Sequence, residues 1–294
     1  MAQVRANGIQ IEYDTFGDRS RRPLLLVMGL GAQMIAWRSE FCEQLADAGH
    51  FVVRFDNRDV GLSSKLDAAG RPDIATVMTQ LAAGKAIRAP YSLDDMADDA
   101  FGLLDCLDLQ RAHVCGASMG GMIVQAMAIK RPERIASLTS IMSSTGNREL
   151  PPSKPEAAAA LLSPAGTDRD SVVERSVRVA GIIGSPAYPG DPEEIKKRAL
   201  EAFERAFYPV GFARQMVAAA SHGNRKPALQ NLNIPALVIH GGADPLVTVE
   251  GGIDTHEALR GSKLMVIDGM GHDLPRQVWP QIVTGITQLT SASH

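Results

Sequence analysis

The sequence predicts an α/β protein with a mostly parallel, doubly wound sheet and an inserted helical cap. Short apolar runs alternate with amphipathic helical stretches along most of the chain. This alternation is typical of a parallel sheet that carries helices on both faces. It stops between about residues 144 and 226, where helical stretches are punctuated by proline and glycine. We therefore expect a core of residues 1–143 and 227–294 and a cap of residues 144–226.

Several elements carry a local signal for where they begin or turn. The dipeptide Asn7-Gly8 is typical of a tight hairpin, and Ser92 is a good N-cap for a helix. Another helix is expected to begin at Asp191-Pro192, because carboxylates follow in its first turn. Strands are expected at residues 3–6, 10–16, 23–28, 51–55, 113–115, 135–142, 235–240 and 263–267. Helices are expected at residues 34–48, 93–107 and 278–289.

Composition and charge exclude several function classes. The 294 residues are 45% hydrophobic and 21% charged, as in an ordinary soluble globular protein. The formal net charge is −3 without long runs of one sign, so we expect no nucleic-acid partner and no membrane contact. No apolar run is long enough to span a bilayer, and residues 1–8 lack the apolar core of a secretory signal. The sequence leaves the oligomeric state open.

Cysteine spacing and the absence of metal motifs narrow the chemistry further. The three cysteines are scattered, so they are expected to be reduced thiols in a cytoplasmic protein. The chain has no H-E-x-x-H and no Cys/His cluster with metal-ligand spacing. The glycines of residues 29–31 do not make a dinucleotide fingerprint, because Met34 stands where G-x-G-x-x-G needs its third glycine. We expect no metal and no cofactor.

The strongest catalytic signal is the pattern G-x-S-x-G at residues 116–120. An apolar run ends in Gly116, and apolar residues recur at helical spacing after Gly120. The pattern predicts a strand, a sharp turn and a helix, with the Ser118 hydroxyl exposed on the turn. Side chains at the two glycines would collide with neighbouring chain in so tight a turn. The alternative is a Gly/Ser-rich turn that only caps a helix.

A serine nucleophile needs a base to take its proton and a carboxylate to orient that base. On a doubly wound sheet both should follow at the carboxyl ends of later strands, in the order Ser, acid, His. Asp244 and His272 follow the last two expected strands, so they are the predicted partners of Ser118. A turn residue at Asp244 and a backbone-bonded loop histidine at His272 are the alternatives. The other candidates lack this context or lie too near His272 in sequence: His50, His113, His222, His240, His256, His294, Asp254, Asp268 and Asp273.

Acyl transfer also needs hydrogen-bond donors for the oxyanion. The turn after residues 23–28 contains Gly29 and Gly31, which let the backbone approach a ligand. The N–H of Leu30 is expected to join that of Met119, which stands at a helix N-terminus. We therefore predict Leu30 and Met119 as the oxyanion hole, with Gly29 and Gly31 beside the substrate. A glycine-rich turn without a ligand is the alternative.

At these residues the chain resembles the α/β-hydrolase superfamily, and most closely its aclacinomycin methylesterase group. The resemblance implies an α/β-hydrolase fold and hydrolysis of a methyl ester, since members of that group cleave one on a polyketide aglycone. The segments that carry it are residues 28–37, 56–61, 116–120 and 269–275.

The chain departs from the superfamily pattern at two positions. Met28 stands where many members have histidine, but a backbone donor does not need that side chain. Asp59 stands where glycine is usual. We interpret the loop that contains Asp59 as structural, with Arg58 paired to a nearby carboxylate.

The predicted function is hydrolysis of a small-molecule carboxylic ester through an acyl-enzyme, such as a methyl ester of a bulky apolar acid. A lactonase or a C–C bond hydrolase with the same residues is an alternative, and a ligand-binding protein without turnover is one of another class. Fold does not determine substrate, so the cap is expected to select it. The apolar residues expected to seal the cap or line its cleft are Val172, Val173, Val177, Ile182, Ile183, Phe203, Phe207, Phe212, Met216 and Val217.

Overall fold

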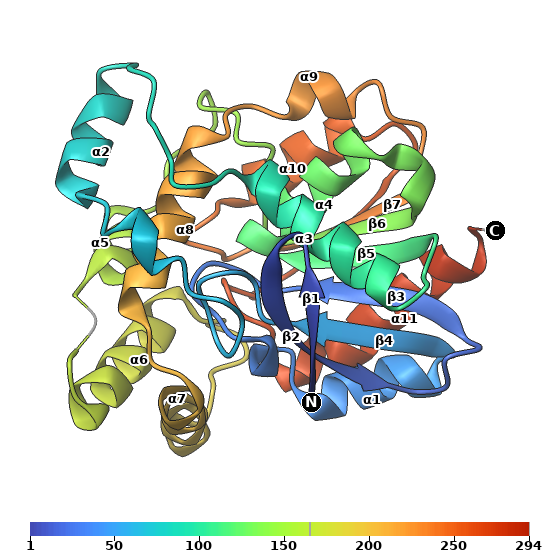
Figure 1. Cartoon of the computed structure of the whole chain (residues 1–294), viewed down its shortest axis with the longest axis horizontal. Helices are drawn as coiled ribbons and strands as arrows, with labels where there is room; N and C mark the ends of the chain where they lie inside the picture. The colour runs from blue at the N-terminus through green and yellow to red at the C-terminus, as the bar shows by residue number, and fades with distance from the viewer. Residues whose placement is uncertain (165, 294) are drawn as a thin grey trace.

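The computed structural model describes residues 1–164 and 166–293, in which eight strands form one sheet in the order β1-β2-β4-β3-β5-β6-β7-β8. The strands are β1 (Ala2–Ala6), β2 (Ile9–Phe16), β3 (Arg22–Val27), β4 (His50–Phe55), β5 (Ala112–Ala117), β6 (Ile135–Ile141), β7 (Ala236–Gly241) and β8 (Lys263–Ile267). The pairs β1–β2 and β2–β4 are antiparallel, and all other neighbouring strands are parallel (Figure 1). The predicted mostly parallel sheet is confirmed.

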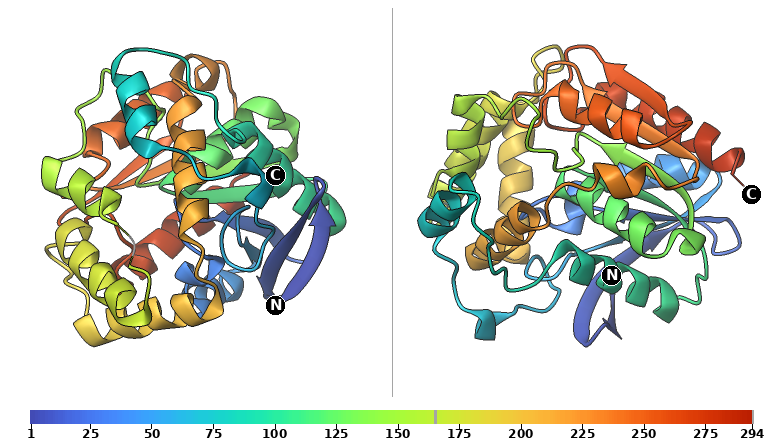
Figure 2. Two further views of the ribbon diagram at one scale, coloured as in Figure 1. Left: turned by 60° about the vertical axis from the view of Figure 1, so that its left-hand side comes forward. Right: turned by 90° about the horizontal axis from the view of Figure 1, so that it is seen from above.

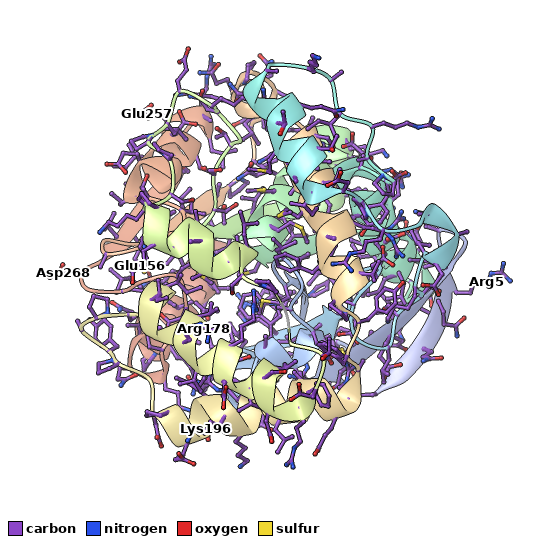
Figure 3. All side chains as sticks on the ribbon, turned by 90° about the vertical axis from the view of Figure 1, so that its left-hand side faces the viewer. Arg5, Glu156, Arg178, Lys196, Glu257 and Asp268 are labelled. Atoms are coloured by element: carbon purple, nitrogen blue, oxygen red, sulfur yellow. The ribbon has the colours of Figure 1, made fainter. Side chains whose placement is uncertain are left out.

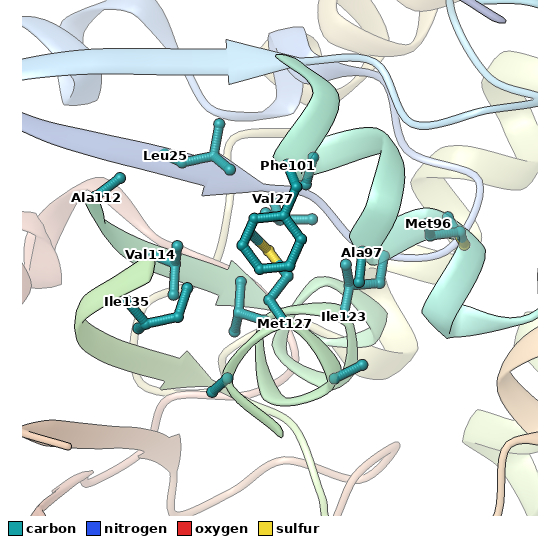
Figure 4. Close-up of a cluster of buried hydrophobic side chains, with 14 of the residues drawn as sticks. Leu25, Val27, Met96, Ala97, Phe101, Ala112, Val114, Ile123, Met127 and Ile135 are labelled. Carbon is teal, nitrogen blue, oxygen red and sulfur yellow. The ribbon is translucent and has the colours of Figure 1, made fainter. Parts of the chain in front are cut away.

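Helices cover both faces of this sheet. They are α1 (Ser39–Asp47), α3 (Leu93–Cys106), α4 (Met119–Lys130), α10 (Val249–Ala258) and α11 (Trp279–Ser291). In β3, Leu25 and Val27 join a buried cluster with α3 and α4, whereas Leu24 and Leu26 join one with α1 and α11. Figure 4 shows part of the first cluster, with the Phe101 ring at its centre. The continuous apolar run of β3 is therefore explained by burial on both sides.

The local turn and cap signals form the structures expected from them. Asn7 and Gly8 have φ of 47° and 79°, the left-handed values that a two-residue type I′ hairpin needs. Ser92 Oγ accepts the Asp95 N–H at 3.1 Å, and the Asp95 carboxylate accepts the Ser92 N–H at 2.7 Å. This capping box starts α3 where the sequence predicts.

The prediction of a helix over residues 34–48 is wrong at the start of the helix. A 3-10 turn, Met34–Ala36, and an extended Trp37 with ψ of 90° precede α1, which begins at Ser39. The Trp37 side chain is buried in the core, and its carbonyl accepts a hydrogen bond from the buried Arg54 guanidinium. Tertiary packing of Trp37 therefore holds the backbone out of the helix.

The segment between β6 and β7 is helical, as the sequence predicts. It holds α5 (Pro155–Leu162), α6 (Arg169–Ile183), α7 (Pro192–Arg205), α8 (Pro209–Ser221) and α9 (Lys226–Leu229). Asp191 caps α7 by accepting the Glu193 N–H at 3.0 Å. In Figures 1 and 2, α5 to α8 gather beside the sheet together with α2 (Ile74–Ala82), a helix not expected from the sequence. Among the described helices, none combines the length and apolar character needed to cross a membrane.

The loop after β4 is fixed by buried ion pairs. Arg58 contacts both oxygens of Asp99 on α3, at 2.6 and 2.7 Å, which confirms that Arg58 pairs with a carboxylate. Asp59, at a φ of 67°, pairs with the buried Arg214 of α8 at 2.6 Å. The departure from glycine at Asp59 thus supplies an anchor for a helix of the inserted segment.

We predict that Asp99→Asn lowers the free energy of unfolding by about 3–5 kcal/mol, because it leaves the buried Arg58 charge without its partner. The matched control is Asp105→Asn on the same helix, whose half-exposed carboxylate pairs with Arg134. That change is expected to cost less than about 1 kcal/mol. Urea unfolding followed by circular dichroism measures both, and equal effects would contradict the prediction.

Candidate active site

Ser118 occupies a strained turn between β5 and α4. Its φ of 56° and ψ of −121° are rare for a residue with a side chain. The Ser118 N–H donates to the Ile141 carbonyl at 2.9 Å, and the Ser118 carbonyl accepts from the Gly121 N–H at 2.9 Å. The turn is therefore anchored to β6 on one side and to its own helix on the other, while the residue stays partly exposed.

The two glycines of the turn are required by close backbone approach. A Cβ at Gly116 would lie 2.1 Å from the Gly120 carbonyl oxygen, and one at Gly120 would lie 2.0 Å from that of Val27. Neither contact is possible for a real side chain, so both positions demand glycine. The steric reasoning from the sequence pattern is confirmed.

Asp244 follows β7 in a turn that holds its carboxylate rigidly. Oδ1 accepts the N–H of Leu246 at 2.8 Å and of Val247 at 2.9 Å. The side chain is fully buried, and its second oxygen, Oδ2, lies 2.7 Å from Nδ1 of His272. The backbone donors orient the carboxylate so that Oδ2 faces the imidazole.

His272 follows β8 and lies between Asp244 and Ser118. Its Nδ1 meets Asp244, and its Nε2 lies 3.0 Å from Ser118 Oγ. The structure thus brings the three sequence-predicted residues from the ends of β5, β7 and β8 into one hydrogen-bonded chain. Such a chain can take a proton from the serine hydroxyl and stabilise the imidazolium that results.

Among the other acids and histidines considered from the sequence, His240 approaches the trio, with Nε2 3.6 Å from Asp244 Oδ2, but its hydrogen bond is to the Val247 carbonyl. His50, His113, His222, His240 and His256 each have a hydrogen-bond partner outside the trio, and His294 lies outside the described residues. Burial lowers the pKa of His113 to about 4 and also lowers that of His240, which favours their neutral forms. Asp268 is exposed at the rim of the molecule (Figure 3).

The turn after β3 packs against the serine. A Cβ at Gly29 would lie 3.0 Å from Ser118 Cβ, so the predicted donor Leu30 belongs to a turn in contact with the nucleophile turn. Met119 is the first residue of α4, and the first N–H groups of a helix have no partner within it. Leu30 and Met119 therefore belong to the two segments that adjoin Ser118, the turn after β3 and the start of α4.

Side chains that sequence reasoning missed hold this turn in place. Asn57 Nδ2 donates to the Met28 carbonyl at 2.9 Å. The Gly31 N–H donates to Oε1 of Gln215 at 2.8 Å, and Gln215 Nε2 donates to the Arg58 carbonyl at 2.8 Å. The N–H of Gly31 therefore already has a hydrogen-bond acceptor, which is a side chain of α8. Gln215 sits within the helical run of α8 and carries no sequence signal that reveals its partners.

A cavity of about 1070 Å³ opens beside the trio, between the core loops and α5, α6 and α7. Gly31 lines it, as do Ala243 and Asp273, the sequence neighbours of Asp244 and His272, whereas Gly29 and the three residues of the trio do not. Among the ten apolar residues singled out from the sequence, only Val177 and Ile182 line this cavity. Figure 3 views the face formed by these helices, with Glu156 labelled on α5, Arg178 on α6 and Lys196 on α7. Within the described ranges, no three His, Cys, Asp or Glu side chains gather as metal ligands would.

A serine on a strand–turn–helix, facing a histidine and a buried acid at the carboxyl edge of a parallel sheet, is typical of hydrolases on this type of sheet. The family described as the alpha/beta hydrolase fold matches residues 22–275, and the chain belongs to that family. The resemblance stated from the sequence motifs is confirmed.

Three known proteins illustrate the similarity. The chain is 30% identical to a rhodomycin D methylesterase from Streptomyces sp. (strain C5), over 94% of this chain and 93% of that protein. It is 27% identical to 3-oxoadipate enol-lactonase 2 from Acinetobacter baylyi, over 90% and 87%. The solved meta-cleavage product hydrolase from Pseudomonas fluorescens IP01 matches with a TM-score of 0.76 and 18% identity, over 100% of this chain and 98% of that one.

We predict that Asp244→Asn lowers kcat for p-nitrophenyl acetate by up to ~10⁴-fold, the size of the effect in serine proteases. The amide keeps the shape of the carboxylate but favours the wrong tautomer of His272. The matched control, Asp268→Asn, changes an exposed carboxylate on the neighbouring loop and is expected to keep nearly the full rate. A larger loss of kcat in Asp268→Asn than in Asp244→Asn would show that Asp268, and not Asp244, is the acid that orients His272.

Proposed function

We propose that this protein is a serine hydrolase that cleaves a carboxylic ester through an acyl-enzyme. The observation that carries the proposal is the hydrogen-bond chain from Asp244 through His272 to Ser118. A turn residue, a loop histidine and a helix-capping serine have no reason to meet at these distances. Their convergence beside a strained turn is the arrangement that nucleophilic catalysis by serine needs.

In the acylation half of the reaction, Ser118 Oγ attacks the ester carbonyl carbon while its proton passes to His272 Nε2. The tetrahedral intermediate then collapses, the bond to the alcohol oxygen breaks, and His272 gives that oxygen the proton. Asp244 keeps the Nδ1–H of the imidazole directed at its carboxylate throughout and stabilises the imidazolium. The alcohol leaves and the acyl group remains on Ser118.

In the deacylation half, water replaces the alcohol. His272 takes a proton from the water as its oxygen attacks the acyl carbon, and then returns the proton to Ser118 as the carboxylic acid leaves. The net reaction consumes one ester and one water, and it yields one acid and one alcohol. No other reactant is required.

The N–H groups of Leu30 and Met119 are the proposed oxyanion hole. The contact of Gly29 with Ser118 and the helix N-terminus at Met119 support this assignment. Gln215 and Asn57 hold the turn so that the donors are oriented before the charge develops. Gly29 and Gly31 act in this proposal by close backbone approach, because the Gly31 amide is already bonded to Gln215.

Residues 144–226 are proposed to act as a cap that selects a bulky, uncharged ester, such as a methyl ester. The cavity beside His272 is large, and Val177 and Ile182 contribute apolar surface to it. The charged side chains of its lining balance in number, with the cations Arg38, Lys154, Arg198 and Arg276 and the acids Glu156, Asp191, Glu194 and Asp273. The similarity to a rhodomycin D methylesterase supports the methyl ester.

Lactone hydrolysis is a second candidate, favoured by the similarity to an enol-lactonase over most of the chain. The same serine, histidine and acid open a lactone, except that acid and alcohol remain in one product. A panel of bulky methyl esters and matched lactones, assayed by titration of released acid, separates the two. A preference for lactones would favour the second candidate.

The cytoplasm is the proposed compartment. Cys42, Cys106 and Cys115 are free thiols in the folded chain, and Cys42 and Cys115 are buried. Unpaired cysteines are typical of a reducing compartment.

We predict that Ser118→Ala removes ester turnover while the protein keeps its circular dichroism spectrum and its melting temperature. The turn accepts a smaller side chain, so only the nucleophile is lost. The triad is worth about 10⁶-fold in a serine protease, so retention of more than about a hundredth of the rate would overturn the assignment. The loss of the wild-type rate should follow the labelling of Ser118 by a phosphonate up to one label per chain, whereas a contaminating esterase would be inactivated without stoichiometric labelling of Ser118.

We predict that kcat/KM rises with acyl bulk and falls for charged esters, because apolar contact is worth roughly 25 cal/mol per Å² buried. Val177→Ala, in the cavity wall, should flatten this ranking without changing the rate for p-nitrophenyl acetate. Val173→Ala, one helical turn before it and not among the lining residues, is the matched control. If Val177→Ala leaves the ranking of esters unchanged, this cavity does not select the substrate.

A further inference from the structure

The loop that carries His272 is bonded to the inserted helical segment. Residues 183–187, here called the docking segment, comprise the end of α6 and the start of its connection to α7, and they lie against residues 269–273, the histidine loop. The His272 N–H donates to the Ile183 carbonyl at 2.7 Å. The backbone of the proposed base is thus held by the inserted segment as well as by the core.

Ser185 binds the histidine loop on both sides of His272. Its Oγ accepts the Gly271 N–H at 2.9 Å and donates to Oδ1 of Asp273. The serine is 3% exposed, so water does not compete freely for these bonds. A single hydroxyl from the docking segment therefore bridges the residues before and after the histidine.

Glycines allow the two segments to touch without intervening side chains. A Cβ at Gly271 would lie 2.3 Å from the Gly184 carbonyl oxygen, and one at Gly269 would lie 2.2 Å from Ala187 Cβ. The Ala187 N–H also donates to the Gly269 carbonyl at 3.2 Å. The two segments are therefore in direct contact on the N-terminal side of His272.

The same two segments form one wall of the cavity. Gly184, Ser185 and Pro186 line it from the docking segment, and Asp273 lines it from the histidine loop. A ligand in the cavity therefore contacts the junction that holds the histidine in place.

We propose that Ser185 is a positioning residue for His272, through which the inserted segment holds the proposed base at its working distance from Ser118. The inference rests on the proposed serine hydrolase function. In this proposal Asp273 accepts the hydrogen bond that fixes the Ser185 hydroxyl. The imidazole ring itself is oriented by Asp244. Proton transfer depends steeply on geometry, so loss of the bridge acts on the chemical step more than on binding.

The test uses p-nitrophenyl acetate, an ester too small to need the cavity wall. Ser185→Ala and Asp273→Ala are expected to lower kcat by about 10-fold to 100-fold with KM changed by less than about 3-fold. Asp273→Asn keeps an oxygen acceptor for the serine hydroxyl and is expected to restore most of the rate. The labelling rate of Ser118 by a phosphonate should fall in parallel with kcat.

The matched control is Ser221→Ala, a serine of α8 whose hydroxyl bonds only to the Ala218 carbonyl of its own helix among the described residues. It should leave kcat and KM unchanged. If Ser185→Ala does not fold, the comparison of Asp273→Ala with Asp273→Asn decides the proposal alone.

Two results would overturn the inference. One is a Ser185→Ala variant with wild-type kcat for p-nitrophenyl acetate, including one in which only the KM for bulky esters changes. The other is an Asp273→Asn variant as slow as Asp273→Ala, which would make charge rather than the bridge the cause. A wild-type protein without phosphonate-sensitive turnover would instead refute the proposed function itself. The wild-type protein is therefore assayed before any variant.

Discussion

The site depends on a backbone contact that leaves no room for a Cβ atom. At the end of β5 the chain turns so sharply that Gly116 meets the Gly120 carbonyl, while Gly120 meets that of Val27. The strained φ of Ser118 is tolerated because β6 and α4 bond its backbone on both sides. This contact sets the position of the hydroxyl, the start of α4 and the approach of the turn after β3, so every other site residue is placed relative to it.

The inserted helical segment packs beside the site and also supplies side chains that bind its loops. Gln215 of α8 bonds the turn that carries Leu30, and Ser185, after α6, bonds the loop that carries His272. The two contacts hold two different loops of the proposed site. Variation in the inserted segment can therefore change the geometry of the chemistry together with the shape of the cavity, which links substrate selection to rate.

Buried charges join these parts into one structure. Arg58 and Asp99 connect the loop after β4 to α3, and Asp59 and Arg214 connect the same loop to α8. Ion pairs of this kind contribute little net stability when formed but cost several kcal/mol when one partner is lost. Their effect is to specify one arrangement of the loop, and with it the position of the Arg58 carbonyl that Gln215 binds.

The sequence by itself determined the parts whose signals are local. The alternation of strands and helices, the Asn7-Gly8 hairpin and the strand–turn–helix at Ser118 all follow from backbone conformations that few residue types accept. The chain order of Ser118, Asp244 and His272 followed as well, because parallel strands bring their carboxyl ends to one edge.

Only the tertiary structure decided what depends on partners distant in the chain. Packing of Trp37 delays α1, Asp59 meets Arg214, and Ser185 meets the histidine loop. Eight of the ten apolar residues singled out from the sequence also do not line the cavity. A hydroxyl, an amide or an apolar side chain on a helix has many possible neighbours, and its local sequence contains nothing that selects among them. The three-dimensional path of the chain makes that selection.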